Sequence, residues 1–197
     1  SRVGDFVATR TEADELLALG LSGGCDSVVL LHLLASLGLG QRLLAIHVHH
    51  GLSPNADAWA DFCTKLCARL DIPLSVQTVT VNLKSGLGIE AAARQARYAA
   101  FSNCGRHTVL LAHHQGDQAE TLLFNLLRGA GVAGAAGMAD ERRHDDLRIL
   151  RPLLNVPRSK LESYAVANQL DWIEDESNAD TKFTRNFLRH EVLAVIS

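Results

Sequence analysis

Short apolar runs alternate with longer amphipathic segments along much of this chain, and this alternation limits its fold more than any other feature. The apolar runs, which we predict to be strands, are Leu16–Leu21, Leu43–His49, Leu74–Val81 and Val109–Ala112. The segments between and after them, which we predict to be helices, are Asp26–Leu37, Asn55–Leu70, Ile89–Cys104 and Asp117–Leu127. Buried strands separated by helices are typical of α/β proteins. We therefore predict a doubly wound, mostly parallel sheet with helices on both faces.

The sequence changes character after Arg128. Gly129–Gly137 is a run of glycine and alanine that predicts an irregular loop. Leu147–Leu150 predicts one further strand, closed by Pro152, and a helix then runs from Pro157 to about Asn168. We expect one domain over residues 1–197, with a core of about residues 1–138 and an extension of residues 139–197.

The composition is that of a globular protein. Of 197 residues, 47% are hydrophobic and 21% are charged, which is enough apolar material for one buried core. The longest apolar stretch, Val28–Ala35, contains His32 and is too short to span a bilayer. Residues 1–5 lack the apolar core of a signal peptide. We therefore expect no membrane association and a cytoplasmic location.

Four cysteines, Cys25, Cys63, Cys67 and Cys104, form no C-x-x-C pair. Zinc knuckles and ferredoxin-type clusters therefore lack their usual ligands, and reduced, mostly buried thiols are expected. Cys25 differs from the others because it precedes a predicted helix. A helix N-terminus lowers the pKa of a thiol, so we expect Cys25 to react with alkylating agents.

The segment Ser22-Gly23-Gly24-Cys25-Asp26-Ser27 follows a predicted strand and begins a predicted helix. Glycines let backbone N–H groups face an anion, the helix adds its positive end, and Ser22 and Ser27 add hydroxyl donors. An ordinary strand-to-helix turn capped by Ser22 or Asp26 is the alternative. No lysine is placed for a G-x-x-x-x-G-K-[ST] loop and no G-x-G-x-x-G pattern is present, which argues against kinase, GTPase and dinucleotide-binding loops.

This Ser-Gly-Gly-x-Asp-Ser pattern resembles the pyrophosphate-binding loop of the PP-loop ATP pyrophosphatases. The resemblance implies an adenine nucleotide alpha hydrolase-like fold and cleavage of ATP between its α and β phosphates, with Mg²⁺ neutralising the charge that develops. A carboxylate beside bound phosphates would be repelled unless a metal lies between them, which makes Asp26 a candidate metal ligand. The ATP-binding residues implied are Ser22, Gly23, Gly24, Cys25, Asp26, Ser27 and His49.

Further motifs resemble those of the lysidine synthetases over nearly the whole chain. They are Ala45–Ser53, Ile89–Tyr98, Leu111–Thr121, Arg151–Leu154, Trp172–Asn178 and Arg185–Arg189. These ligases join the ε-amine of free L-lysine to carbon 2 of the wobble cytidine of tRNA(Ile), after the base has been adenylated by ATP. The resemblance therefore implies a tRNA-modifying ligase whose partners are tRNA(Ile) and lysine.

The same resemblance suggests roles for individual residues. The catalytic candidates are Asp26, Asp117, Glu120 and Arg185, with Asp26 and Asp117 as metal ligands. The substrate-binding candidates are Arg94, Arg97, His113 and Arg189. The family usually has acids at positions 116 and 117, whereas this chain has Gly116, so one metal or proton site is in doubt. Asp117 as a helix N-cap with Glu120 in a capping box, and Arg94 and Arg97 as solvated side chains, are the alternatives.

Other functions stay open at this point. A tRNA 2-thiolation enzyme of the same family would need paired cysteines, which are missing. A zinc hydrolase could use His47 and His49 with the His113-His114-x-x-Asp117 segment. A nucleotide-binding module without catalysis is suggested only by Gly116.

The net charge of −3 is unusual for a protein that binds nucleic acid. The chain also stops in an unfinished apolar run, Leu193–Ser197. We therefore expect C-terminal tRNA-binding domains outside this chain, and a homodimer is left open.

Overall fold

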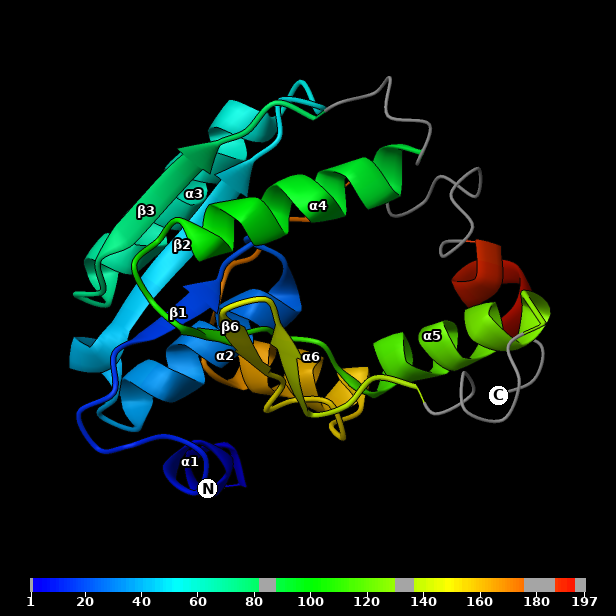
Figure 1. Ribbon diagram of the computed structural model, residues 1–197. Coiled ribbons are helices and arrows are strands. Elements are labelled where there is room, and N and C mark those ends of the chain that lie inside the picture. The colour runs from blue at the N-terminus through cyan, green and yellow to red at the C-terminus, as the bar shows by residue number, and fades with distance from the viewer. Residues whose placement is uncertain (1, 82–87, 130–136, 176–186, 194–197) are drawn as a thin grey trace.

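The computed structural model describes residues 2–81, 88–129, 137–175 and 187–193, and within them one sheet has six strands in the order β3-β2-β1-β4-β6-β5 (Figure 1). The strands are β1 (Leu17–Gly20), β2 (Leu43–His49), β3 (Leu74–Thr78), β4 (Thr108–Leu110), β5 (Glu141–His144) and β6 (Leu147–Leu150). All neighbouring pairs are parallel except β5 with β6, which form an antiparallel hairpin. The predicted mostly parallel α/β sheet is confirmed.

Helices cover both faces of the sheet (Figure 1). They are α1 (Arg2–Ala8), α2 (Cys25–Ser36), α3 (Ala56–Arg69), α4 (Ile89–Ser102), α5 (Gln115–Leu127) and α6 (Arg158–Ala167), with a 3₁₀ turn, η1 (Gly40–Arg42), and a π-helical segment, η4 (Leu188–Leu193). α5 extends away from the sheet, and η4 lies beside its distal half (Figure 1). No helix in the described ranges is both long and apolar enough to cross a membrane.

Successive residues of a strand point to opposite faces of the sheet and belong to two separate hydrophobic cores. Leu17 and Leu19 of β1 are fully buried against α1, α2, α3 and α6 on one face. Ala18, between them, points to the other face, where Tyr98 and Phe101 of α4 cover the sheet. A strand buried on both faces has no polar positions, which explains why β1 reads as a continuous apolar run.

β1 lies at the centre of the sheet, and the chain moves outward from it in two directions. β2 and β3 follow on one side, and β4, β6 and β5 on the other. Loops that leave the carboxyl ends of neighbouring strands diverge at such a switch point, and this divergence leaves room for a ligand. The loop from β1 to α2 and the segment from β4 to α5 both start at this place.

The sequence prediction missed α1 and β5. α1 is short and buries only Val3 and Val7, so it carries little periodic signal. β5 is the polar sequence Glu-Arg-Arg-His at the edge of the sheet, where no apolar alternation is required. The predicted loop over Gly129–Gly137 falls mostly on residues 130–136, outside the described residues.

Candidate active site

The loop between β1 and α2 is held in shape by its own hydroxyl groups. Ser27 Oγ donates to the carbonyl of Gly24 at 2.9 Å and accepts the amide of Gly23 at 3.2 Å. Since the single hydroxyl proton of Ser27 is used in this way, Ser22 Oγ is the donor in the 3.1 Å contact between the two serines. Both serines, which we expected to offer donors to a phosphate, therefore stabilise the loop itself in this structure.

The anion-binding capacity of the loop comes from backbone groups. The first intrahelical bond of α2 runs from the amide of Val28 to the carbonyl of Gly24 at 3.1 Å. The amides before it, Cys25 to Ser27, have no carbonyl partner within the helix and lie at its positive end. This arrangement suits a phosphate group.

Ile173 packs directly on the loop, a contact that sequence reasoning did not assign. Its amide donates to the carbonyl of Gly23 at 2.9 Å. A Cβ atom on Gly23 would lie 2.4 Å from Ile173 Cδ1, and Gly23 has a φ of +90°. Glycine is therefore required here twice, for its backbone angle and for space. The only sequence signal was that Ile173 lies inside the Trp172–Asn178 motif.

Asp26 and Asp117 come together at one imidazole ring. Asp26 lies in the first turn of α2 and Asp117 in the first turn of α5. His114 Nε2 is 3.6 Å from Asp26 Oδ2 and 3.7 Å from Asp117 Oδ2. The two carboxylates that we expected to share a metal thus face the same buried group from different helices.

The cap of α5 differs from the alternative considered above. His114, and not Asp117, is the N-cap residue, and its ring accepts the amide of Gly116 at 2.9 Å. Asp117 completes the capping box by accepting the amide of His114 at 2.8 Å. Glu120, one turn later, is 3% exposed and does not take the capping-box role considered for it, since the N3 residue of the observed box is Asp117.

A cluster of arginines surrounds His113. Arg151, only 2% exposed, donates from Nε to His113 Nδ1 at 3.3 Å. Burial lowers the pKa of His113 to about 4; nearby Asp117 opposes this shift, and Arg151, Arg94 and Arg97 add to it. His113 is therefore a neutral ring that carries its proton on Nε2. Arg94, a substrate-binding candidate, stacks on Tyr98 with its guanidinium 4.8 Å from the ring centroid.

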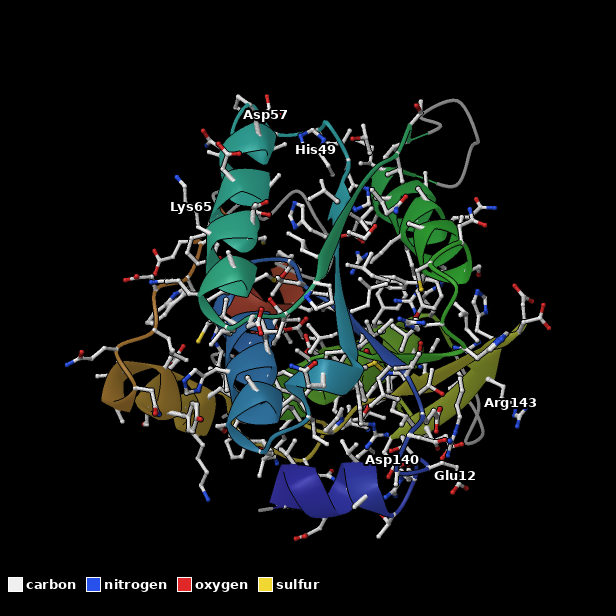
Figure 2. The ribbon with its side chains drawn as sticks, turned by 90° about the vertical axis from the view of Figure 1, so that its left-hand side faces the viewer. Glu12, His49, Asp57, Lys65, Asp140 and Arg143 are labelled. Carbon is white, nitrogen blue, oxygen red and sulfur yellow. The ribbon has the colours of Figure 1, made fainter. Side chains whose placement is uncertain are left out.

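His49, predicted to contact ATP, lies at the carboxyl end of β2. Its Nε2 is 2.9 Å from Asp57 Oδ1 in the first turn of α3, and Figure 2 shows the two side by side. His47 points to the same face of β2, but its Nδ1 donates to the carbonyl of Leu21 at 2.9 Å. Across the described ranges, no group of three or more His, Cys, Asp or Glu side chains is arranged to hold a metal ion. This geometry does not favour a zinc hydrolase.

The expectation for Cys25 is wrong. Cys25 is 4% exposed, and burial, reinforced by the charge of Asp26, raises the pKa of its thiol to about 11. Desolvation of the thiolate outweighs the helix N-terminus. Cys63 and Cys67 are also buried, and burial raises their pKa values to about 12 and about 11. The cysteines are therefore not arranged for sulfur transfer or for a cluster.

The predicted positions Arg185 and Arg189 lie wholly or partly outside the described residues. Arg185 is not among the described residues, and for Arg189 only its place in η4 is described.

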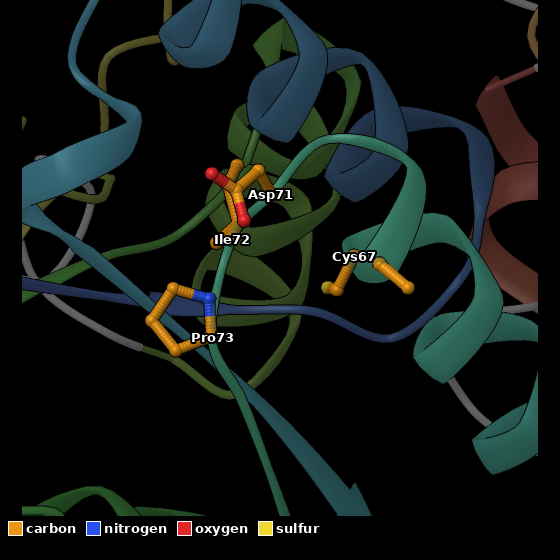
Figure 3. Close-up of a pocket in the computed structure, with 5 residues that line it drawn as sticks. Cys67, Asp71, Ile72 and Pro73 are labelled. Carbon is orange, nitrogen blue, oxygen red and sulfur yellow. The ribbon is translucent and has the colours of Figure 1, made fainter.

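A shallow pocket of about 250 Å³ between the end of α3 and the start of β3 is lined by Cys67, Ala68, Asp71, Ile72 and Pro73 (Figure 3). The pocket lies at the amino-terminal edge of the sheet, away from the loop between β1 and α2, and is not part of the candidate active site.

A family model described as a PP-loop domain matches residues 2–196. The chain belongs to the PP-loop family. The PP-loop domain is 51% identical, over 181 residues, to a tRNA(Ile)-lysidine synthase of Actinobacillus pleuropneumoniae serotype 3 (strain JL03), covering 91% of this chain and 42% of the relative. It is 53% identical, over 180 residues, to that of Pseudomonas aeruginosa (strain ATCC 15692), covering 89% of this chain and 40% of the relative. The chain thus spans about two fifths of the length of these relatives.

Solved structures support the fold of the PP-loop domain. The U34-tRNA thiolase NcsA of Methanococcus maripaludis superposes with a TM-score of 0.68 at 18% identity, covering 99% of this chain and 77% of that chain. The NMN synthetase of Francisella tularensis superposes with a TM-score of 0.55 at 19% identity, covering 86% and 68%. At these identities the likeness concerns the fold alone.

Proposed function

We propose that this PP-loop domain carries the ATP-using active site of a tRNA(Ile)-lysidine synthetase. The observation that carries the proposal is the identity of about 50%, over about nine tenths of the chain, with relatives that have this activity in their name. In the proposed reaction, the carbonyl oxygen of the wobble cytidine attacks the α-phosphorus of ATP and pyrophosphate leaves. The ε-amine of lysine then attacks carbon 2 of the base, and AMP leaves with the oxygen.

The first turn of α2 is the proposed binding place for the phosphates of ATP. The backbone amides of this turn, from Cys25 to Ser27, would hold the leaving pyrophosphate, and Ile173 would keep the loop closed behind it. These contacts require no side-chain charge from the loop, which fits the absence of a lysine from it.

Asp26 and Asp117 are the proposed ligands for Mg²⁺. Two carboxylates suit this ion, which usually takes one or two of them and completes its coordination with phosphate oxygens and water. When bound, Mg²⁺ would neutralise charge on the phosphates during attack. The two side chains, from α2 and α5, would fix its position against the loop.

The arginine cluster is the proposed place for the other reactants. Arg94 and Arg97 lie one turn apart on α4 and, with the neutral His113, could bind the carboxylate of lysine or a tRNA phosphate. Arg185 and Arg189 have proposed roles by family resemblance alone.

The test is a mass measurement on tRNA. The complete protein that contains this domain would be incubated with tRNA(Ile), ATP and lysine, and the intact tRNA weighed. We expect a mass increase of one lysine less one water, lost when the wobble cytidine is replaced by uridine or when ATP is omitted. A product that gains the mass of sulfur in place of oxygen would instead indicate a thiolation enzyme, and an unchanged tRNA mass would contradict the proposal.

A further inference from the structure

His114 makes two kinds of contact at once, one with each ring nitrogen. Nδ1 accepts the Gly116 amide at 2.9 Å, and this places the ring proton on Nε2. Nε2–H then lies 3.6 Å from an oxygen of Asp26 and 3.7 Å from an oxygen of Asp117. Both separations are longer than a hydrogen bond, so one N–H dipole attracts two carboxylates without pairing fully with either.

The cap alone does not explain a histidine at this position. Serine, aspartate or asparagine caps a helix with a shorter side chain. A cap uses only Nδ1, whereas the far side of the ring points at the two acids. The His114 side chain is 4% exposed, so its attraction for the carboxylates is weakly screened by water.

Gly116 leaves the space that the ring occupies. A Cβ atom at this position would lie 2.7 Å from His114 Cε1 and 3.1 Å from Nδ1. A side chain at this position would therefore require the imidazole ring to shift from its place against the Gly116 amide. This contact gives a physical reason for glycine here, next to Asp117.

We propose that His114 is a positioning residue for the adenylation step, and that Gly116 leaves the space that its ring occupies in this chain. The Nε2–H group of His114 holds the carboxylates of Asp26 and Asp117 toward one point from two different helices, so that both could serve as ligands of the Mg²⁺ ion proposed above. This inference rests on the proposed function, because it needs both acids to act on ATP.

Asparagine and glutamine separate the two roles of His114. The Oδ1 atom of asparagine can replace Nδ1 as the cap but leaves nothing in the place of Nε2. The Nε2 atom of glutamine can reach toward the acids but supplies no cap acceptor. In the complete protein, His114→Asn should keep the melting temperature near that of the wild type and lower kcat for pyrophosphate release by about 10- to 100-fold, with a smaller change in the KM for ATP.

His114→Gln should show the reverse pattern, with a lower melting temperature and a kcat above that of His114→Asn. A His114→Asn enzyme with the wild-type kcat, or a glutamine variant no faster than the asparagine variant, would overturn the inference. Asp26→Asn and Asp117→Asn are run beside them. If these two also keep full activity, the proposed function has failed; if they lose activity while His114→Asn keeps it, only the role of His114 is wrong.

The role of Gly116 can be tested without any activity. Alanine is the better helix former, so Gly116→Ala should raise the melting temperature when nothing opposes it. In the wild-type background the ring opposes it, and the melting temperature should fall. In the His114→Asn background the ring is absent, and the same change should raise it. Equal effects in both backgrounds would show that the ring and Gly116 are independent. Selective ¹⁵N labelling of histidine should also report His114 as the Nε2–H tautomer, and an Nδ1–H tautomer would overturn the inference.

Discussion

The amide of Ile173 donates a 2.9 Å hydrogen bond to the carbonyl of Gly23, joining two segments about 150 residues apart in the chain. The side chain of Ile173 fills the space that a Cβ on Gly23 would need. The conformation of the loop between β1 and α2 is therefore stabilised by the hydroxyl groups of its own serines and by contact with the segment that follows α6. Its glycine-rich sequence alone does not set its conformation.

Gly23→Ala should lower stability and abolish nucleotide binding. The added methyl group would strike Ile173 at 2.4 Å, and a non-glycine residue at a φ of +90° adds strain of about 1–2 kcal/mol. Gly38→Ala is the matched control, since Gly38 has a φ of +76° and nothing lies within 4 Å of its Cβ position. It should lower the melting temperature through strain alone and keep ATP binding, measured by calorimetry. Unchanged ATP binding by Gly23→Ala would contradict the packing described here.

Asp117→Asn and Asp26→Asn should each slow pyrophosphate release by about a hundred- to a thousandfold, because a charge that stabilises the transition state is lost. Asparagine can still accept the amide of His114, so the Asp117→Asn enzyme should melt near the wild-type temperature. Asp61→Asn, an exposed change on α3, should leave the rate unchanged. Wild-type pyrophosphate release by Asp117→Asn would show that this residue serves the cap alone.

Three of the four thiols should be unreactive in the folded protein. Burial raises the pKa values of Cys25, Cys63 and Cys67 to about 11 or 12, so little thiolate exists at neutral pH. Cys104 is half-buried and should react first with a thiol reagent. Mass mapping after brief alkylation, with and without denaturant, measures this order. Fast alkylation of native Cys25 would contradict its burial.

Stability should fall as the pH is lowered from about 6.5 to about 4. Burial lowers the pKa values of His113 and His50 in the folded protein to about 4, whereas an unfolded histidine titrates near pH 6.5. Within this window the unfolded chain binds more protons, so unfolding becomes more favourable with each step toward acid. Melting temperatures from pH 8 to pH 4 check this. His50→Gln should flatten the slope, and an unchanged slope would remove His50 from the explanation.

This chain alone should bind tRNA weakly. Its net charge is −3, so only separated arginines can contact phosphates, and affinity should fall steeply with salt. Titration of labelled tRNA at several salt concentrations measures both quantities. Tight binding specific to tRNA(Ile) would contradict this expectation.

The fold was largely predictable because its strands are apolar and sharply bounded. β2 and β6 have the predicted bounds, Leu43–His49 and Leu147–Leu150. β5 was not predictable, since a polar edge strand owes its structure to its hydrogen-bonded partner and not to its own pattern.

Most residues of the candidate site could be predicted from the sequence, but the contacts between them could not. The pattern of the loop pointed to Asp26, and the histidine-rich motif to Asp117, but no spacing indicates that His114 lies between them. The contact of Ile173 with Gly23 depends on how the segment after α6, about 150 residues further along the chain, packs against the loop, and the local sequence does not indicate this. The error on Cys25 has an electrostatic cause, because the cost of burying a thiolate exceeds what a helix end supplies.

The polar hairpin at the end of the sheet also has a consequence for self-association. If the exposed edges of two copies of β5 paired antiparallel about Arg142 or about Arg143, that arginine would stand opposite its own counterpart in the other copy. Two guanidinium groups directly opposed across a strand pair repel each other. In these registers the edge therefore resists the strand-to-strand joining by which open sheets aggregate.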